Sequence, residues 1–310
     1  MTSKTNKKII VSLLIIMICA VSSLLVYNIL SDYGNYYEQT TIVKEEIIEE
    51  ANINDLNVRG LKADFKLVEN TTDNTIIVRQ YSNKKIKDRD LVNTSVVGQS
   101  LKVQDSRGSW VVFDLSFLSS RRGENYIEIS IPKDRLEHLK INQSSGSLTF
   151  DTFNLKSFDL SLGSGSITGN TIISEKIDLN TSSGEIEINT LQGDGNIKLS
   201  SGKNTYTNLD GTMDIKVTSG KLTAGHYIGS SDIKLSSGKL TFNEASFLSE
   251  SSIKITSGSV YINTDPSALF CFDTSVTSGK ADTPQSSCKD PNAIDFKIKV
   301  SSGKVIINND

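Results

Sequence analysis

The chain has 310 residues, with 33 basic and 36 acidic side chains and a formal net charge of −3. Such a balance argues against nucleic acid as a partner, because proteins that bind it carry a basic surface. Its two histidines, His138 and His226, lie far in sequence from Cys271 and Cys288 and show no metal-ligand spacing, so we expect no metal and no cofactor.

The N-terminal segment predicts membrane attachment. Residues 9–30 are almost entirely apolar and uncharged, roughly 33 Å as a helix, which matches the thickness of a bilayer core. Three lysines precede this run and acidic residues follow it, so residues 1–8 are predicted to be cytoplasmic and the rest extracellular. A cleaved signal peptide is the competing interpretation, with the small residues Ala20 and Ser22 near a cleavage site.

Two segments follow without a clear repeat. Residues 31–50 are polar and glutamate-rich, and are expected to form a solvated juxtamembrane stalk, with a helix as one conformation open to it. Residues 51–138 contain β-type stretches without phased glycines, and are expected to form an irregular β cap and the first coils of the domain that follows. Trp110 is predicted to pack in the core of this cap.

Residues 139–310 carry a repeat. A glycine preceded by serine recurs nine times, at intervals of 19, 19, 18, 18, 18, 20, 21 and 24 residues. Self-similarity at a nearly fixed period is the signature of a solenoid. The nine glycines, which we interpret as structural corners, are Gly146, Gly165, Gly184, Gly202, Gly220, Gly238, Gly258, Gly279 and Gly303.

Apolar residues keep a fixed phase around each glycine. They recur five and three residues before it and two and four residues after it, as Ile233, Leu235, Leu240 and Phe242 do around Gly238. Alternation at period two predicts a strand with one buried face on each side of a corner. A positive φ at the glycine would explain the sharp turn, and the serine hydroxyls could form a ladder between stacked corners.

One coil of this size cannot bury its apolar face alone, so the coils are expected to stack in sequence order. The predicted fold is all-β: a single-stranded parallel β-helix, or β-solenoid, with coils of about 18–24 residues, preceded by one transmembrane helix. Nine coils would make a rod of roughly 43 Å. The last strand, around Val305, is followed by three polar residues only, so its edge is a candidate for self-association with another chain.

Charged residues fall into columns on the outside of the predicted coils. One lysine column lies four residues before the glycines, beside an aspartate column, and a second follows the corner directly. One interpretation is that lysine–aspartate pairs offset like-charge stacking and keep the surface soluble. The other is that the second column binds an anionic polymer of the cell envelope, because a periodic row of charges suits a repeating polyanion. The centre of this candidate polyanion-binding site would be Lys203, Lys221 and Lys239.

Signs of catalysis are weak. Asp214 and Asp232, one coil apart, could resemble a glycosidase pair, but each is expected beside a lysine on an exposed face. Residues 163–169 resemble a phosphate loop but lack its Lys-Ser/Thr pair. We therefore predict a protein that is not an enzyme and has no catalytic residue. Cys271 and Cys288 are a candidate disulfide, and two free thiols remain the alternative.

The run Tyr126-Ile-Glu-Ile-Ser-Ile-Pro-Lys133, followed by Leu139-Lys-Ile-Asn-Gln-Ser-Ser-Gly-Ser-Leu-Thr-Phe150 and the later repeats, resembles the putative-adhesin family of bacterial β-strand-repeat proteins. With its anchor, the chain is also similar to membrane-bound members found near envelope-stress regulators in Gram-positive bacteria. This resemblance implies a single-pass, cell-surface solenoid that is adhesin-like or binds an envelope polymer. The alternatives are a sensory or regulatory role, exerted on a membrane-protein partner, and a polysaccharide-degrading β-helix enzyme.

Overall fold

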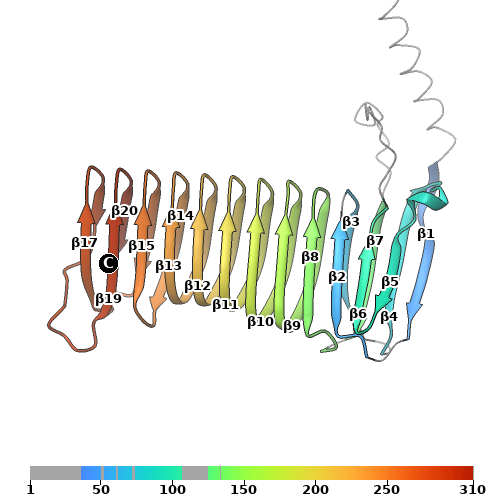
Figure 1. The fold of residues 1–310 in the computed structure, drawn as a ribbon, viewed down its shortest axis with the longest axis horizontal. Helices are drawn as coiled ribbons and strands as arrows, with labels where there is room; N and C mark the ends of the chain where they lie inside the picture. Colours follow the sequence, from blue (N-terminus) through green and yellow to red (C-terminus); the bar gives the residue numbers. More distant parts are fainter. Residues whose placement is uncertain are drawn as a thin grey trace, which may run out of the picture.

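The computed structural model describes residues 36–49, 52–60, 62–71, 74–106, 125–132 and 134–309. These residues form a long rod of stacked β coils (Figure 1). The segment predicted to cross a membrane, residues 9–30, and Trp110 both lie outside the described residues. Within the described ranges, no helix has the length and apolar character needed to span a bilayer.

The centre of the rod consists of long strands that bend halfway. β9 (Ser147–Leu162), β10 (Ser166–Thr181), β11 (Glu185–Leu199), β12 (Lys203–Val217) and β13 (Lys221–Leu235) each form one coil. Each pairs in parallel with the same positions of the next coil, so that Leu179 lies between Leu160 and Ile197. The predicted all-β fold of stacked, parallel repeats is confirmed.

The core is a set of apolar columns inside the coils. Ile197, Ile215 and Ile233 stack in register and are at most 1% exposed. The next residue along each strand is a lysine that points outward. One coil departs from this pattern at Asn204, which is fully buried and donates its Nδ2 to the hydroxyl of Tyr206 at 3.2 Å. Burial of Tyr206 raises the pKa of that hydroxyl, so the pair stays neutral.

The nine predicted glycines lie at corners. In every repeat one strand ends three residues before the glycine, and the next begins one residue after it, as β12 and β13 do around Gly220. Backbone amides carry the stacking here: Ser219 donates to the Ser200 carbonyl at 2.7 Å, and Lys221 donates to that of Gly202 at 3.0 Å. Hydroxyl contacts between described corners are sparse, with Ser278 and Ser302 3.2 Å apart, so a continuous serine ladder does not form.

The reason for glycine at these corners differs from the predicted one. Only Gly146, with φ +83°, has the left-handed backbone that the sequence suggested for all nine. At the other eight, an added Cβ would lie within 3.0 Å of the backbone oxygen of the glycine in a neighbouring coil; for Gly220 the distance to the Gly202 oxygen would be 2.6 Å. Glycine is therefore required by the close approach of stacked backbones.

A second glycine column, missed by our sequence analysis, lies at the opposite bend. Gly193, Gly211 and Gly229 occupy it in three successive coils, with φ values of +141°, +126° and +151°. Any other residue would be strained by this backbone, and its Cβ would also meet the coil before it. The signal was present, because these glycines are spaced 18 residues apart.

The coils do not stack in sequence order at the C-terminal end. β15 (Ser251–Ile255) and β16 (Ser259–Thr264) are followed in space by β19 (Ile294–Val300) and β20 (Lys304–Asn308). β17 (Phe270–Val276) and β18 (Lys280–Asp282) lie outside them and form the end of the rod, so the C terminus lies one coil inward (Figure 1). The prediction that the strand around Val305 forms the free edge is therefore wrong. β14 (Lys239–Phe247) continues the regular stack before this exchange.

A similar exchange occurs at the N-terminal end. β2 (Asp55–Gly60) pairs with β8 (His138–Gln143) on one side and with β6 (Ser100–Gln104) on the other. β3 (Asp64–Asn70) lies in the same way between β9 and β7 (Asn125–Pro132). Antiparallel strands complete this end: β1 (Tyr36–Ile48), β4 (Ile76–Lys84) and β5 (Asn93–Val97). A single 3-10 turn, Asp88–Asp90, links β4 to β5. Residues 36–48 are thus a strand of the sheet, in contrast to the solvated stalk predicted for residues 31–50.

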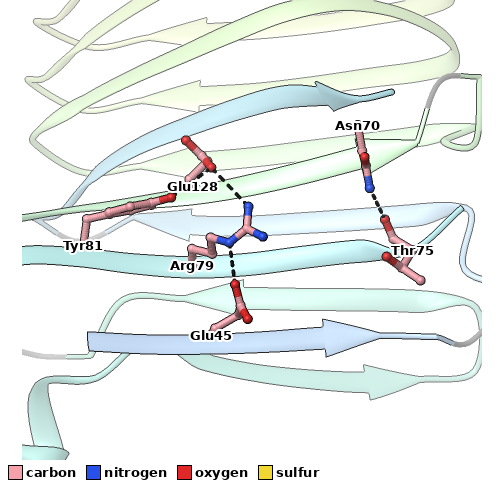
Figure 2. Close-up of polar contacts among 6 residues, drawn as sticks. All are labelled: Glu45, Asn70, Thr75, Arg79, Tyr81 and Glu128. Carbon is pink, nitrogen blue, oxygen red and sulfur yellow. Dashed lines mark hydrogen bonds and ion pairs between the residues drawn. The ribbon is translucent and has the colours of Figure 1, made fainter. Parts of the chain in front are cut away.

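Side chains of alternating charge join these N-terminal strands (Figure 2). The guanidinium of Arg79 on β4 lies 2.6 Å from Glu45 on β1 and 3.8 Å from Glu128 on β7. The hydrogen bond to Glu45 raises the pKa of Arg79. Asn70 donates to the Thr75 carbonyl at 2.9 Å, which closes the connection from β3 to β4. Of these contacts, the one between Arg79 and Glu45 joins β1 to β4, alongside the antiparallel backbone pairing of the two strands.

Asp105 closes the corner between β2 and β3, where no Ser-Gly pair is present. Its carboxylate is 5% exposed and accepts the backbone amides of Lys62 at 2.8 Å and Ala63 at 2.9 Å. At the corners from Gly165 onward, backbone amides donate instead to the carbonyls of a neighbouring coil, while at the Gly146 corner Ser147 donates to the Asp64 carboxylate at 2.6 Å. A buried carboxylate therefore replaces those carbonyls at this corner.

Candidate functional site

The structure brings the three predicted lysines into one row. Lys203, Lys221 and Lys239 begin three successive strands and lie directly opposite one another in the parallel register. Each side chain is exposed on the arm that leaves the corner. Because paired strands lie about 4.8 Å apart, the row presents three ammonium groups on a line along the rod. We call these three residues the lysine row.

The environment differs along the lysine row. Lys203 lies 2.5 Å from Glu185 in the preceding coil, and this hydrogen bond raises the pKa of the lysine. Lys239 lies over the ring of Tyr261, with its Nζ 4.7 Å from the ring centroid. Lys221 stands between two lysines, and within the described ranges it forms no ion pair. The positive charge left for a ligand is therefore centred on Lys221 and Lys239.

The other post-corner lysines are displaced from the row by one coil. Ser259 follows Lys239 in register, and Lys304 and then Lys280 come after it because of the exchanged coil order. Lys280 is paired with Asp282 at 2.6 Å in its own strand. These two lysines therefore form a second, separate group rather than an extension of the row.

A shallow groove of about 570 Å³ leads to the lysine row along the corners. Stacked backbone forms its floor, because the corner glycines of four coils have no side chain to fill it. Serine hydroxyls line its sides, and Glu185 and Lys203 stand at its end. An extended polymer could lie along this groove in contact with hydroxyl and backbone groups. The lining residues are Gly146, Ser164, Gly165, Ser166, Ser183, Gly184, Glu185, Ser201, Gly202 and Lys203.

The lysines before the corners have a different environment, on the arm that enters the corner. Lys198, Lys216 and Lys234 also lie opposite one another in register. Lys198 is 4.0 Å from Asp178, and Lys234 is 2.5 Å from Asp232. Here the structure agrees with the charge-balancing interpretation, because acidic side chains accompany the column. Lys254 and Lys299 continue this second row in register, so it holds five lysines. Its first three members carry the same charge as the lysine row and serve as its control.

The geometry around Asp214 and Asp232 does not favour acid–base catalysis. The two residues are opposite each other in register. Burial raises the pKa of Asp232, but hydrogen bonds from Lys234 and Ser252 outweigh that effect, so the pKa is lowered overall. A general acid in a glycosidase needs the opposite shift. Burial does raise the pKa of Asp210, but this residue lies at the other bend.

Cys271 and Cys288 form a disulfide. This bond joins β17 to the loop between β18 and β19, a pairing that the sequence left open. His138 contacts Ser157 at 2.6 Å, and His226 contacts Glu244 at 2.9 Å, in different parts of the rod. Across the described ranges, no group of three or more histidine, cysteine or acidic side chains is placed to hold a metal ion.

The chain belongs to the family described as Toastrack DUF4097, whose model matches residues 53–308. No protein of curated function matches the sequence. This assignment agrees with the stacked-strand architecture, and it carries no catalytic or ligand-binding residue with it.

Several solved structures are similar to this chain. One is described as a "putative lipid binding protein" from Parabacteroides distasonis, with 16% identity and a TM-score of 0.49, covering 87% of this chain and 98% of the other. Another is a "putative adhesin" from Bacteroides fragilis, with 13% identity and a TM-score of 0.42, covering 87% and 97%. A "putative cell adhesion protein" from Clostridium sporogenes has 12% identity and a TM-score of 0.25, covering 86% and 98%. Identities and scores this low transfer no ligand to this chain.

Proposed function

We propose that this protein is a non-enzymatic, adhesin-like protein of the cell surface that binds an anionic polymer of the cell envelope through the lysine row. The observation that carries the proposal is the register of Lys203, Lys221 and Lys239, with Lys221 flanked on both sides by like charge. Like charges directly opposite each other destabilise a sheet. A bound polyanion would relieve this repulsion while gaining contacts to several coils at once.

The groove along the corners supports the same proposal. It approaches Lys203 from the N-terminal side, so a polymer that lies in it would reach the lysine row without turning. Hydroxyl groups of Ser164, Ser183 and Ser201 would contact sugar or glycerol units, and the lysines would contact the phosphates or carboxylates. A repeating ligand suits a site in which each coil offers an equivalent contact.

The location follows from the same proposal. A single N-terminal span, with the first eight residues in the cytoplasm, would place the rod outside the cell, where envelope polymers are found. The disulfide between Cys271 and Cys288 supports this location, because disulfides persist in oxidising compartments. In this arrangement the antiparallel end, with β1, is the end nearest the membrane.

The test is a binding measurement with the full chain in non-ionic detergent and purified poly(glycerol phosphate) as the probe. At low ionic strength, Lys203→Ser/Lys221→Ser/Lys239→Ser is expected to weaken binding about tenfold, because the exposed charges of Lys221 and Lys239 are lost and Glu185 loses its partner Lys203. The matched control, Lys198→Ser/Lys216→Ser/Lys234→Ser, removes the same charge from the other arm and should change affinity less than about twofold. Equal losses in both variants would mean that net charge alone drives binding, and the proposal would be wrong.

A further inference from the structure

A pocket of about 600 Å³ lies at the end of the post-corner arm, where β14, β16 and β20 run side by side. Ligand pockets in proteins commonly measure roughly 300–1,000 Å³, so this one has room for a small molecule or for one unit of a polymer. It lies further along the arm than the lysine row, because Lys239 begins β14 and Asn243 follows four residues later. The lining residues are Asn243, Glu244, Ala245, Ser246, Asn263, Thr264, Asp265, Pro266 and Asn308.

A β-bulge in β14 lies at this pocket. Between the pairs Phe242–Ile262 and Ala245–Thr264, β14 has two residues and β16 has one. Both of these β14 residues line the pocket. A bulge bends its strand and redirects the side chains that it carries. The equivalent positions of β10 and β11 keep a regular register, so the bulge is a local departure from the repeat.

Three asparagines on neighbouring strands supply the amide groups of the pocket. Asn263 donates its Nδ2 to the Asn243 carbonyl at 3.1 Å and accepts from Nδ2 of Asn308 at 3.1 Å, so both ends of its amide are used. Among the described residues, the side-chain amide of Asn243 and Oδ1 of Asn308 have no hydrogen-bond partner. Both side chains are exposed. Asn263 therefore links the strands, and its two neighbours keep hydrogen-bonding capacity for a ligand.

Two carboxylates give the pocket a negative charge. Ser267 donates its hydroxyl and its amide to Oδ1 of Asp265, and these hydrogen bonds lower the pKa of Asp265. The Glu244 carboxylate lies 2.9 Å from Nδ1 of His226. In each residue the other carboxylate oxygen has no hydrogen-bond partner within the described ranges. The lining residues named above include no lysine or arginine, so the pocket disfavours the anionic polymer proposed for the lysine row.

The lining favours a ligand rich in hydroxyl groups. A peptide cannot add to β14 or β16 as a strand, because each of them already pairs with a strand on both sides. Ala245 and Pro266 are the only apolar lining residues, too few to hold a hydrophobic molecule. Amides both donate and accept, and carboxylates accept, so together they match the adjacent hydroxyl groups of a sugar. We propose that this pocket binds a neutral sugar unit of a glycan through Asn243, Asn308 and Asp265. This site is separate from the lysine row and does not depend on the function proposed for that row.

The test is saturation-transfer NMR on the full chain in a polyoxyethylene detergent, which has no sugar headgroup. The probes are maltotriose, which offers hydroxyl groups alone, and triacetylchitotriose, which adds acetamido groups; at least one is expected to bind. Asn243→Ala/Asn308→Ala should weaken that binding about tenfold, because the hydrogen bonds of two side chains are lost. The matched control is Asn170→Ala/Asn189→Ala, which removes two exposed amides at the same position after the corner glycine, in coils without the bulge. It should change affinity less than about twofold.

Two results would overturn the proposal: neither saccharide binds the parent chain, or the two asparagine variants lose affinity equally. The Lys203→Ser/Lys221→Ser/Lys239→Ser variant should bind the sugar as the parent does, and a loss as large as that of Asn243→Ala/Asn308→Ala would place the sugar at the lysine row instead. If the variant at Asn243 and Asn308 fails to fold, as judged by circular dichroism, Asp265→Asn replaces it. That change keeps the acceptor for Ser267 but removes the charge, so it should weaken binding about fivefold, and unchanged affinity would contradict the proposal.

Discussion

The exchanged order of the last two coils predicts that truncating two equivalent valines to alanine costs unequal amounts of folding stability. Val300 on β19 and Val276 on β17 lie directly opposite each other in register and occupy the same column of the core. Val300 is 1% exposed and Val276 is 41% exposed. If the coils stacked in sequence order, the valine of the last coil would be the outer one.

The cost of truncating each valine to alanine follows from its burial. Removing two methyl groups from Val300 loses about 1.6 kcal/mol of transfer free energy, and the cavity raises the cost to about 2 kcal/mol. The same change at Val276 removes groups that are already partly hydrated, so about 1 kcal/mol or less is expected. Both variants keep the backbone and the charge unchanged.

The assay is urea unfolding of the full chain in detergent, followed by circular dichroism, with hydrogen exchange of the intact protein as a second measurement. Exchange reports on single coils, which matters because a repeat protein can unfold in parts. Amides of residues 294–300 should exchange more slowly than those of residues 272–276. A larger loss of stability for Val276→Ala than for Val300→Ala, or slower exchange in β17 than in β19, would refute the exchanged order.

Two further substitutions test the corners. Gly220→Ala would place a Cβ 2.6 Å from both the Gly202 oxygen and Leu199 Cγ, so we expect a loss of about 1–3 kcal/mol in urea unfolding; unchanged stability would show that the neighbouring coil can move aside. Asp105→Ala leaves the amides of Lys62 and Ala63 without their acceptor and should cost about 2–4 kcal/mol, whereas Asp105→Asn keeps an oxygen there and should cost less. Equal losses for these two variants would mean that the charge of Asp105, rather than its hydrogen bonds, stabilises the corner.

The repeat could be predicted from the sequence because each unit contains a Ser-Gly pair with apolar residues at fixed distances from the glycine. Which residues point inward follows from their distance to a corner glycine, and the structure follows that rule closely. The stacking order could not be predicted from phase alone, because the units around Gly279 and Gly303 present their strands at the same positions relative to the corner. One signal was available: the unit around Gly279 has Thr274 and Thr283 at positions that are mostly apolar in the other units, which suits a coil with an open side.

The lysine row could also be predicted, because its members have equivalent positions in consecutive units. The three lysines differ in charge environment because Glu185, at the same position one coil earlier, lies opposite Lys203 and pairs with it. That contact follows only from the register of the strands. The strand of residues 36–48 was missed because its glutamates suggested a solvated segment. It pairs with β4, in which Arg79 lies opposite Glu45 but more than thirty residues away, and no local pattern reveals that contact.

The salt dependence of binding to poly(glycerol phosphate) tests the proposed function most directly. The affinity of the unmodified chain should fall steeply as ionic strength rises, because exposed charge contacts are screened. The Lys203→Ser/Lys221→Ser/Lys239→Ser variant should bind weakly at low salt, and its affinity should change little as ionic strength rises. The affinities of the variant and of the unmodified chain should therefore become equal at high salt. Parallel curves with equal slopes would show that the polymer binds elsewhere and would contradict the assignment of the lysine row.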